Sequence, residues 1–165
     1  MRRLLALLVL LAAAAGCGRV HTLQEGTYDL HLDDVIRDDC GLMQVDPELG
    51  SAALTVSGDF VQMSYSRYQI ELSGEYLLRE EEFTADGSAA NVSAEARGQQ
   101  CLVDLITVHF DAKADCKVQY SGTLRITYQT PTNSECACQL WVSYHATAKG
   151  ADPAKDACPA PASQT

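Results

Sequence analysis

Alternation of apolar and polar residues with a period of two is the feature that most limits how this chain can fold. Tyr28, Leu30 and Leu32 alternate with polar neighbours, as expected for a strand with one buried face. The same phase returns later in the chain, at Leu124, Ile126 and Tyr128 and at Leu140, Val142, Tyr144 and Ala146. Beyond the first 16 residues, no apolar stripe with helical spacing is longer than two turns. The chain is therefore predicted to form an all-β domain.

Dipeptides that contain glycine separate the alternating segments and predict where the chain turns. Gly58-Asp59 predicts a tight hairpin turn, Ser73-Gly74 a bend and Asp86-Gly87 a further turn. Residues 91–96, NVSAEA, fit either a strand or a short helix. One face of a strand over residues 101–112 is predicted to carry Leu102, Ile106, Val108 and Phe110. Together these signals predict eight or nine short strands, arranged as an antiparallel sandwich or an up-and-down barrel.

The first 16 residues have the pattern of a secretory signal peptide. Arg2 and Arg3 precede a run of twelve apolar residues, LLALLVLLAAAA (4–15), which is followed by Gly16 and Cys17. At about 1.5 Å per residue, this run is too short to cross roughly 30 Å of hydrocarbon as a helix. The alternative of a buried N-terminal helix fits less well, because the run has no polar face.

The end of this run, Ala14-Ala15-Gly16-Cys17, resembles the lipobox of bacterial lipoproteins, although a larger aliphatic residue is commoner at the place of Ala14. The resemblance implies that Cys17 becomes the first mature residue and carries diacylglycerol and palmitate. Gly18 in place of an Asp implies sorting to the outer membrane. Plain secretion, with cleavage at a nearby alanine, is the alternative.

The chain divides accordingly into four parts. We expect a signal peptide (residues 1–16), a lipidated cysteine and tether (17–25), an all-β domain (26–148) and a tail rich in Ala and Pro (149–165).

The number of cysteines supports the assignment of Cys17 as a lipid site. The chain has seven cysteines, and an odd number is unfavourable in an oxidising compartment. Lipidation of Cys17 leaves six candidates for disulfides: Cys40, Cys101, Cys116, Cys136, Cys138 and Cys158. The Cys136-Ala137-Cys138 motif could instead contribute two thiolates to a metal. No histidine lies at a spacing typical of zinc sites, however, so we predict disulfides and no metal.

The connectivity of the disulfides stays open among 15 arrangements. Cys101 and Cys116 bracket a strand and a polar turn, so a bridge between them could join neighbouring strands. Cys136 and Cys138 should point to the same face of a strand and take different partners. A bridge to Cys158 would hold the tail.

The charge of the chain restricts its partners. Removal of the signal peptide deletes two of 12 basic residues and none of 22 acidic ones, which takes the net charge from −10 to −12. Such a chain repels phosphate backbones and anionic headgroups, so nucleic-acid binding is excluded and membrane attachment must use the lipid.

A loose resemblance bears on ligand binding. Gly26-Thr27-Tyr28 resembles the G-x-W start of lipocalin-type barrels, with Tyr in place of Trp. The resemblance implies a small apolar ligand inside a barrel; the alternative is that Tyr28 is simply a core residue.

The remaining candidates for a site are acidic and histidine residues. The adjacent carboxylates Asp33-Asp34, Asp38-Asp39 and Glu80-Glu81-Glu82 cannot converge on calcium within one strand, so we interpret them as solvated charges. His31, His109 and His145 should face outward on separate strands and could form a surface site with carboxylates. We assign no catalytic residue and no cofactor, and expect a noncatalytic binding module. The alternatives are an envelope protein-interaction lipoprotein and, more remotely, an enzyme with a surface His/carboxylate site.

Overall fold

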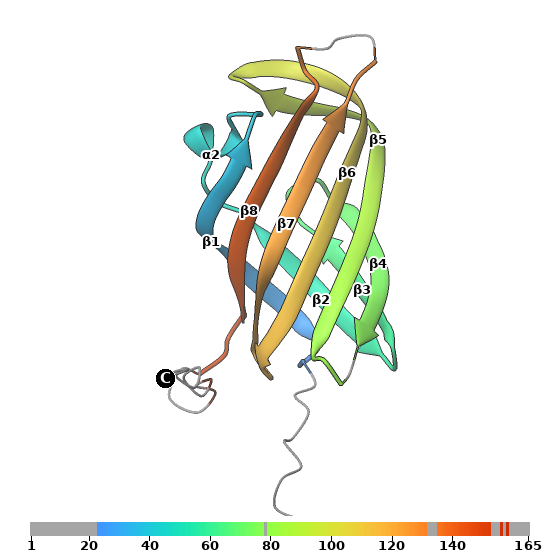
Figure 1. Ribbon diagram of the computed structural model, residues 1–165, viewed down its shortest axis with the longest axis vertical. Helices are drawn as coiled ribbons and strands as arrows, with labels where there is room; N and C mark the ends of the chain where they lie inside the picture. The colour runs from blue at the N-terminus through green and yellow to red at the C-terminus, as the bar shows by residue number, and fades with distance from the viewer. Residues whose placement is uncertain (1–22, 78, 132–134, 153–155, 157, 159–165) are drawn as a thin grey trace, which may run out of the picture.

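Eight antiparallel strands form a closed barrel in the computed structural model, which describes residues 23–77, 79–131, 135–152, 156 and 158. Each strand pairs with the next along the chain, and β1 closes the sheet by pairing with β8 (Figure 1). The prediction of an all-β fold is confirmed, in its barrel form. The predicted signal peptide, Cys17 and Gly18 lie outside the described residues.

The elements follow one another without crossover connections. They are β1 (Gly26–Asp38), α2 (Leu42–Val45), β2 (Ser51–Ser57), β3 (Phe60–Tyr65), β4 (Ile70–Leu77), β5 (Glu82–Ala96), β6 (Gln99–Cys116), β7 (Gln119–Gln129) and β8 (Cys138–Ala148).

The strands differ greatly in length, so the barrel wall is shorter on the side formed by β2, β3 and β4 than on the side formed by β5 and β6. β2, β3 and β4 have 7, 6 and 8 residues, whereas β5 has 15 and β6 has 18. β4 begins at Ile70, and the pairing of Ser73 with Asp86 places that start opposite residue 89 of β5. The last pair between β6 and β7 is Leu105 with Gln129. Residues 90–104 therefore extend past both neighbouring strands as a two-stranded hairpin, here called the flap.

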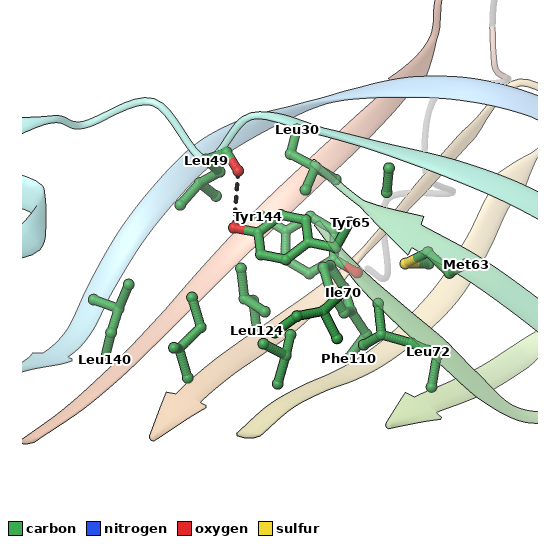
Figure 2. Close-up of a cluster of buried hydrophobic side chains, with 14 of the residues drawn as sticks. Leu30, Leu49, Met63, Tyr65, Ile70, Leu72, Phe110, Leu124, Leu140 and Tyr144 are labelled. Carbon is green, nitrogen blue, oxygen red and sulfur yellow. Dashed lines mark hydrogen bonds between the residues drawn. The ribbon is translucent and has the colours of Figure 1, made fainter. Parts of the chain in front are cut away.

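Aromatic side chains fill the interior of the barrel. The largest side chains with less than 2% exposure are mostly aromatic, and they include Tyr28, Tyr65, Tyr76, Tyr120, Tyr144, Phe83 and Phe110. Phe110 packs edge-on against Tyr65 and Tyr144, with ring centroids 5.4 and 5.5 Å apart. Figure 2 shows this cluster, in which the Tyr65 hydroxyl donates a hydrogen bond of 2.9 Å to the carbonyl oxygen of Leu49. The alternation of the sequence thus corresponds to one continuous core.

The N-terminal segment closes the end of the barrel at which β1 begins. Leu23 is buried, and the Tyr28 hydroxyl donates to the carbonyl oxygen of Gln24 over 2.6 Å. The segment predicted as a tether therefore contributes to the core before Gly26. Of the helices formed by the described residues, none has the length and apolarity needed to cross a membrane.

One of the three predicted turns is confirmed, and two are wrong. Ser57 pairs with Phe60 across Gly58-Asp59, as predicted. Ser73-Gly74 lies inside β4, however, and Asp86-Gly87 lies inside β5. A Cβ on Gly74 would come within 1.9 Å of the Thr84 carbonyl oxygen, so this glycine permits a close approach of β5. In both strands the glycine serves packing and does not mark a turn.

The predicted faces are correct for most strands but wrong for Leu102. Ile106, Val108 and Phe110 are buried, whereas Leu102 is 68% exposed and its neighbours Cys101 and Val103 are buried. The inward phase of β6 shifts between Val103 and Ile106, where the strand leaves the barrel wall and enters the flap. Residues 91–96, which fitted either a strand or a helix, complete β5.

Three disulfides join the six cysteines: Cys40–Cys138, Cys101–Cys136 and Cys116–Cys158. Cys136 and Cys138 take different partners, as predicted, and Cys158 joins the tail to β6. The suggested bridge between Cys101 and Cys116 is wrong, because these residues lie at opposite ends of the 18-residue β6.

We expect Gly74→Ala to destabilise the barrel by roughly 1–3 kcal/mol, the usual effect of overpacking. The added methyl group would meet backbone atoms of Thr84, which cannot rotate away. Urea unfolding of the variant, beside Ser73→Ala at an exposed position of the same strand, measures the effect. Equal midpoints for both variants would contradict the close approach of β4 and β5.

Candidate functional site: the flap pocket

The flap bends over the end of the barrel opposite to the start of β1, toward α2 (Figure 1). Its tip is the two-residue loop Arg97-Gly98, and both residues have positive φ, 52° and 75°. This is the backbone that a tight type I′ hairpin requires. Val92 packs against the core and Ala94 and Ala96 are buried, so one face of the flap covers the barrel end.

Arg97 connects the tip of the flap to two other segments. Its main-chain N–H donates to the carbonyl oxygen of Cys40 over 2.6 Å. Its guanidinium donates to the carbonyl oxygens of Asp39 and Glu135, each over 2.9 Å. Hydrogen bonds from a charged donor are stronger than those between neutral groups, so Arg97 fixes the tip of the flap to the segment after β1 and the segment before β8.

Two disulfides reinforce the same junction. Cys101–Cys136 ties the flap to the segment before β8, and Cys40–Cys138 ties the end of β1 to the start of β8. The covalent links and Arg97 thus meet at one end of the barrel.

The short helix α2 forms the wall opposite the flap. The Asp38 carboxylate accepts hydrogen bonds from the N–H groups of Leu42 and Met43, over 3.1 and 2.9 Å. These bonds satisfy donors of the first turn that have no partner within the helix. Leu42 is buried and fixes α2 against the barrel.

A pocket of about 390 Å³ lies between the flap, α2 and the turn from β3 to β4. Its walls are Val92, Ser93, Ala94 and Glu95 of the flap, Leu42 and Asp46 of the α2 segment, Arg67, Tyr68 and Gln69 of the turn, and Tyr128 of β7. A smaller pocket of about 100 Å³ shares Leu42, Asp46, Arg67 and Glu95 with it and reaches Arg97. We call the two together the flap pocket.

The wall of the flap pocket combines apolar side chains with a few polar groups. The hydroxyls of Tyr68 and Tyr128 form a hydrogen bond of 2.8 Å. Burial raises the pKa of Tyr68, although the bond to Tyr128 acts in the opposite direction, so both phenols stay neutral at physiological pH. The Arg67 side chain, 14% exposed, lies 3.5 Å from the Asp46 carboxylate. Mixed walls of this kind suit an amphipathic ligand.

The interior of the barrel is filled with packed aromatic side chains. Tyr28, the position compared with the lipocalin motif, is a fully buried core residue. The hydroxyls of Tyr120 and Tyr144 are buried and have no hydrogen-bond partner among the described residues. Desolvation raises the pKa of both phenols. An apolar ligand inside the barrel would therefore have to displace a packed aromatic core.

The structure brings two of the three outward histidines together. His31 and His145 stack on neighbouring strands with ring centroids 5.0 Å apart, and His145 Nδ1 lies 2.6 Å from Asp33 Oδ1. His109 is separate and pairs with Asp86 over 2.6 Å. In the described part of the chain, no three His, Cys, Asp or Glu side chains form a group that could hold a metal.

The acidic pairs that the sequence analysis singled out have separate local roles. Asp38 bonds to the first turn of α2, whereas Asp39 accepts a hydrogen bond of 2.6 Å from Arg37. Glu82 pairs with Lys113 over 3.2 Å.

Sequence reasoning missed the residues that form the flap pocket. Arg97-Gly98 lies between two alternating segments and was a usable hairpin signal, but the position of its tip depends on β5 and β6 being longer than their neighbours. Arg67 and Tyr68 follow β3 in a turn and show no pattern of their own.

Comparison of the chain with protein-family models, with curated proteins and with solved structures gives no match. A proposal of function therefore rests on the sequence and the geometry of this chain alone.

We expect Arg97→Ala to loosen the flap without unfolding the barrel. Loss of the guanidinium bonds should speed amide hydrogen exchange in residues 92–103 roughly tenfold, because each bond from a charged donor contributes appreciably. Exchange in β7 and β8 should stay unchanged, and the same measurement on Arg37→Ala is the control. Uniform acceleration over all strands would show that Arg97 supports the whole barrel and not the flap.

Proposed function

We propose that this chain is a lipid-anchored lipoprotein of the bacterial cell envelope, sorted to the outer membrane, whose barrel is a noncatalytic binding module. The flap pocket is its ligand site, and the ligand is a small amphipathic molecule or a segment of an envelope protein. The observation that carries the proposal is a pocket of about 390 Å³ between the flap and the α2 segment. The disulfides of Cys101 and Cys40 tie these two walls to Cys136 and Cys138.

The three disulfides support an extracytoplasmic location, because such bonds persist in oxidising compartments. The direction of the barrel supports anchoring through Cys17. The chain enters the barrel at the end where β1 begins, and the flap and α2 lie at the other end (Figure 1). The flap pocket between them lies at that end too. A lipid on Cys17 would therefore leave the flap pocket facing away from the membrane.

Docking of a folded envelope protein onto the outer surface of the domain, outside the flap pocket, is the second candidate function. Exposed apolar side chains favour it: Val45 of α2 is 59% exposed, and Leu102, on the flap, is 68% exposed. A protein partner that covered these side chains would remove their apolar surface from water.

We expect Cys17→Ser to release the protein from the membrane fraction, because only a thiol can form the thioether to diacylglycerol. Cys158→Ser removes a cysteine at the other end of the chain and should leave membrane attachment intact. Fractionation of expressing cells, followed by mass analysis of the N-terminal peptide, measures both. Membrane association of Cys17→Ser at the wild-type level would contradict the lipoprotein assignment.

We expect Val92→Trp to remove the ligand by filling the flap pocket. Small molecules and proteins that co-purify with the native lipoprotein, identified by mass spectrometry, should be depleted at least tenfold in this variant. Leu102→Trp adds the same side chain to an exposed position of the flap and is the matched control. Depletion by Leu102→Trp alone would favour the second candidate, and equal recovery with both variants would contradict a ligand site in the flap pocket.

A further inference from the structure

The flap pocket is bordered by the edge of a strand. Four consecutive residues of β5, Val92 to Glu95, line it. Consecutive side chains of a strand point to opposite faces, so a surface that touches all four must meet the main chain between them. On this side β5 has already passed the start of β4 and has no neighbouring strand.

The hairpin geometry identifies which main-chain groups face the pocket. Ala96 and Gln99 flank the two-residue loop and pair with each other, so their N–H and C=O groups point across the hairpin. The N–H and C=O groups of Ala94, two residues earlier, likewise point across the hairpin, toward Cys101. Ser93 and Glu95 therefore direct their N–H and C=O groups away from β6, toward the flap pocket. No hydrogen bond from these groups to other segments occurs in the part of the chain that the structure describes.

Another segment of the same chain, at Cys40, already pairs with the tip end of this strand edge. The N–H of Arg97, next in the series after Ser93 and Glu95, donates to the carbonyl oxygen of Cys40. Gly41 follows with φ of 68° and turns the chain away into α2. The edge beside Ser93 and Glu95 is thus left open at the point where the pocket begins.

We propose that the flap pocket binds an extended peptide, which adds to the open edge of β5 as a further strand. This inference rests on the proposed function and names its ligand class. Main-chain hydrogen bonds to Ser93 and Glu95 would supply affinity, and alternate side chains of the peptide would supply specificity.

The surroundings of the edge define which side chains the peptide should carry. On the inner face, Leu42, Val92 and Ala94 provide an apolar surface for one set of alternate residues. On the outer face, the carboxylate of Glu95 has no ion-pair partner within the described residues. The only cation among the residues lining the larger pocket, Arg67, is held by Asp46. A peptide that alternates apolar and cationic residues therefore complements the site.

A second copy of this chain is a poorer occupant. Its net charge of −10 opposes self-association, and its own edge at Ser93 and Glu95 carries the same carboxylate. A cationic peptide is attracted by the negative net charge of the chain and by the carboxylate of Glu95.

The test uses the blocked peptide acetyl-Lys-Val-Lys-Val-Lys-amide and the full-length lipoprotein in detergent, with binding measured by calorimetry. Glu95→Pro removes one N–H from the open edge, where proline is compatible with a strand. Gln100→Pro removes an N–H from the opposite open edge of the same hairpin and is the matched control, because Gln100 pairs with Glu95 across the flap. Glu95→Gln keeps the N–H and removes only the charge.

We expect Glu95→Pro to weaken binding of the peptide at least tenfold and Gln100→Pro to leave it unchanged. Glu95→Gln should weaken binding two- to fivefold, as for an exposed ion pair. In the added strand, either the lysine N–H groups (antiparallel addition) or the valine N–H groups (parallel addition) face β5. One of two methylated forms of the peptide, carrying methyl groups on the main-chain nitrogens of its lysines or of its valines, should therefore bind to the wild-type protein more weakly than the unmodified peptide. In nuclear magnetic resonance spectra, the amide protons of Ser93 and Glu95 should become protected from exchange when the peptide binds.

Three results would overturn the proposal. They are no binding of the peptide at millimolar concentration, equal binding to Glu95→Pro and Gln100→Pro, or a dimer of the wild-type protein that Glu95→Pro dissociates. Failure of this proposal is distinct from failure of the proposed function. A co-purified molecule that Val92→Trp loses and Glu95→Pro retains would keep the flap pocket as the ligand site and exclude strand addition.

Discussion

The pairing of β1 with β8 is the interaction on which the rest of the structure depends. It joins the two ends of the sheet and leaves the wall without a full-length free edge. Closure also encloses a core large enough for most of the tyrosines. Because the strands in the closed wall differ in length, closure does not make the two ends of the barrel alike. The N-terminal segment covers one end of the barrel. At the other end, the flap extends beyond the short strands β2, β3 and β4.

The flap follows from this inequality. Residues 90–104 extend beyond β4 and β7 and would be an isolated two-stranded hairpin, which is marginally stable in water. Burial of Ala94, Ala96 and Val103 against the barrel end stabilises it. The bonds of Arg97 and the Cys101–Cys136 disulfide add to that stabilisation. The result is a strand edge that is held in place but is left without a neighbour along the flap pocket.

The positions at which the structure departs from the sequence pattern have a common physical origin. Ser73-Gly74 and Asp86-Gly87 have turn chemistry, but a glycine is equally suited to a place where two strands approach closely, and only the register of β4 on β5 decides which applies. Leu102 lies in the same alternating phase as Ile106, Val108 and Phe110, yet its side chain is exposed. The reason is that the inward face of β6 shifts where the strand leaves the barrel wall. The suggested Cys101–Cys116 bridge assumed a turn between them, whereas one continuous strand separates them. In each case the length, register or course of a strand decides the outcome, and none of these is visible in the local sequence.

The amino-acid sequence by itself determined the all-β class, the inward face of most strands and the suitability of six cysteines for three disulfides. Alternation can be read from neighbouring residues, and the even number of cysteines left after Cys17 follows from a count, so neither needs the fold. The sequence also carries the whole basis for the expectation of a lipid on Cys17. Only the tertiary structure decided between barrel and sandwich, the partner of each cysteine, and the existence of the flap pocket. These depend on strand register and on the relative lengths of neighbouring strands, which bring Arg67, Glu95 and Tyr128 together from distant parts of the chain.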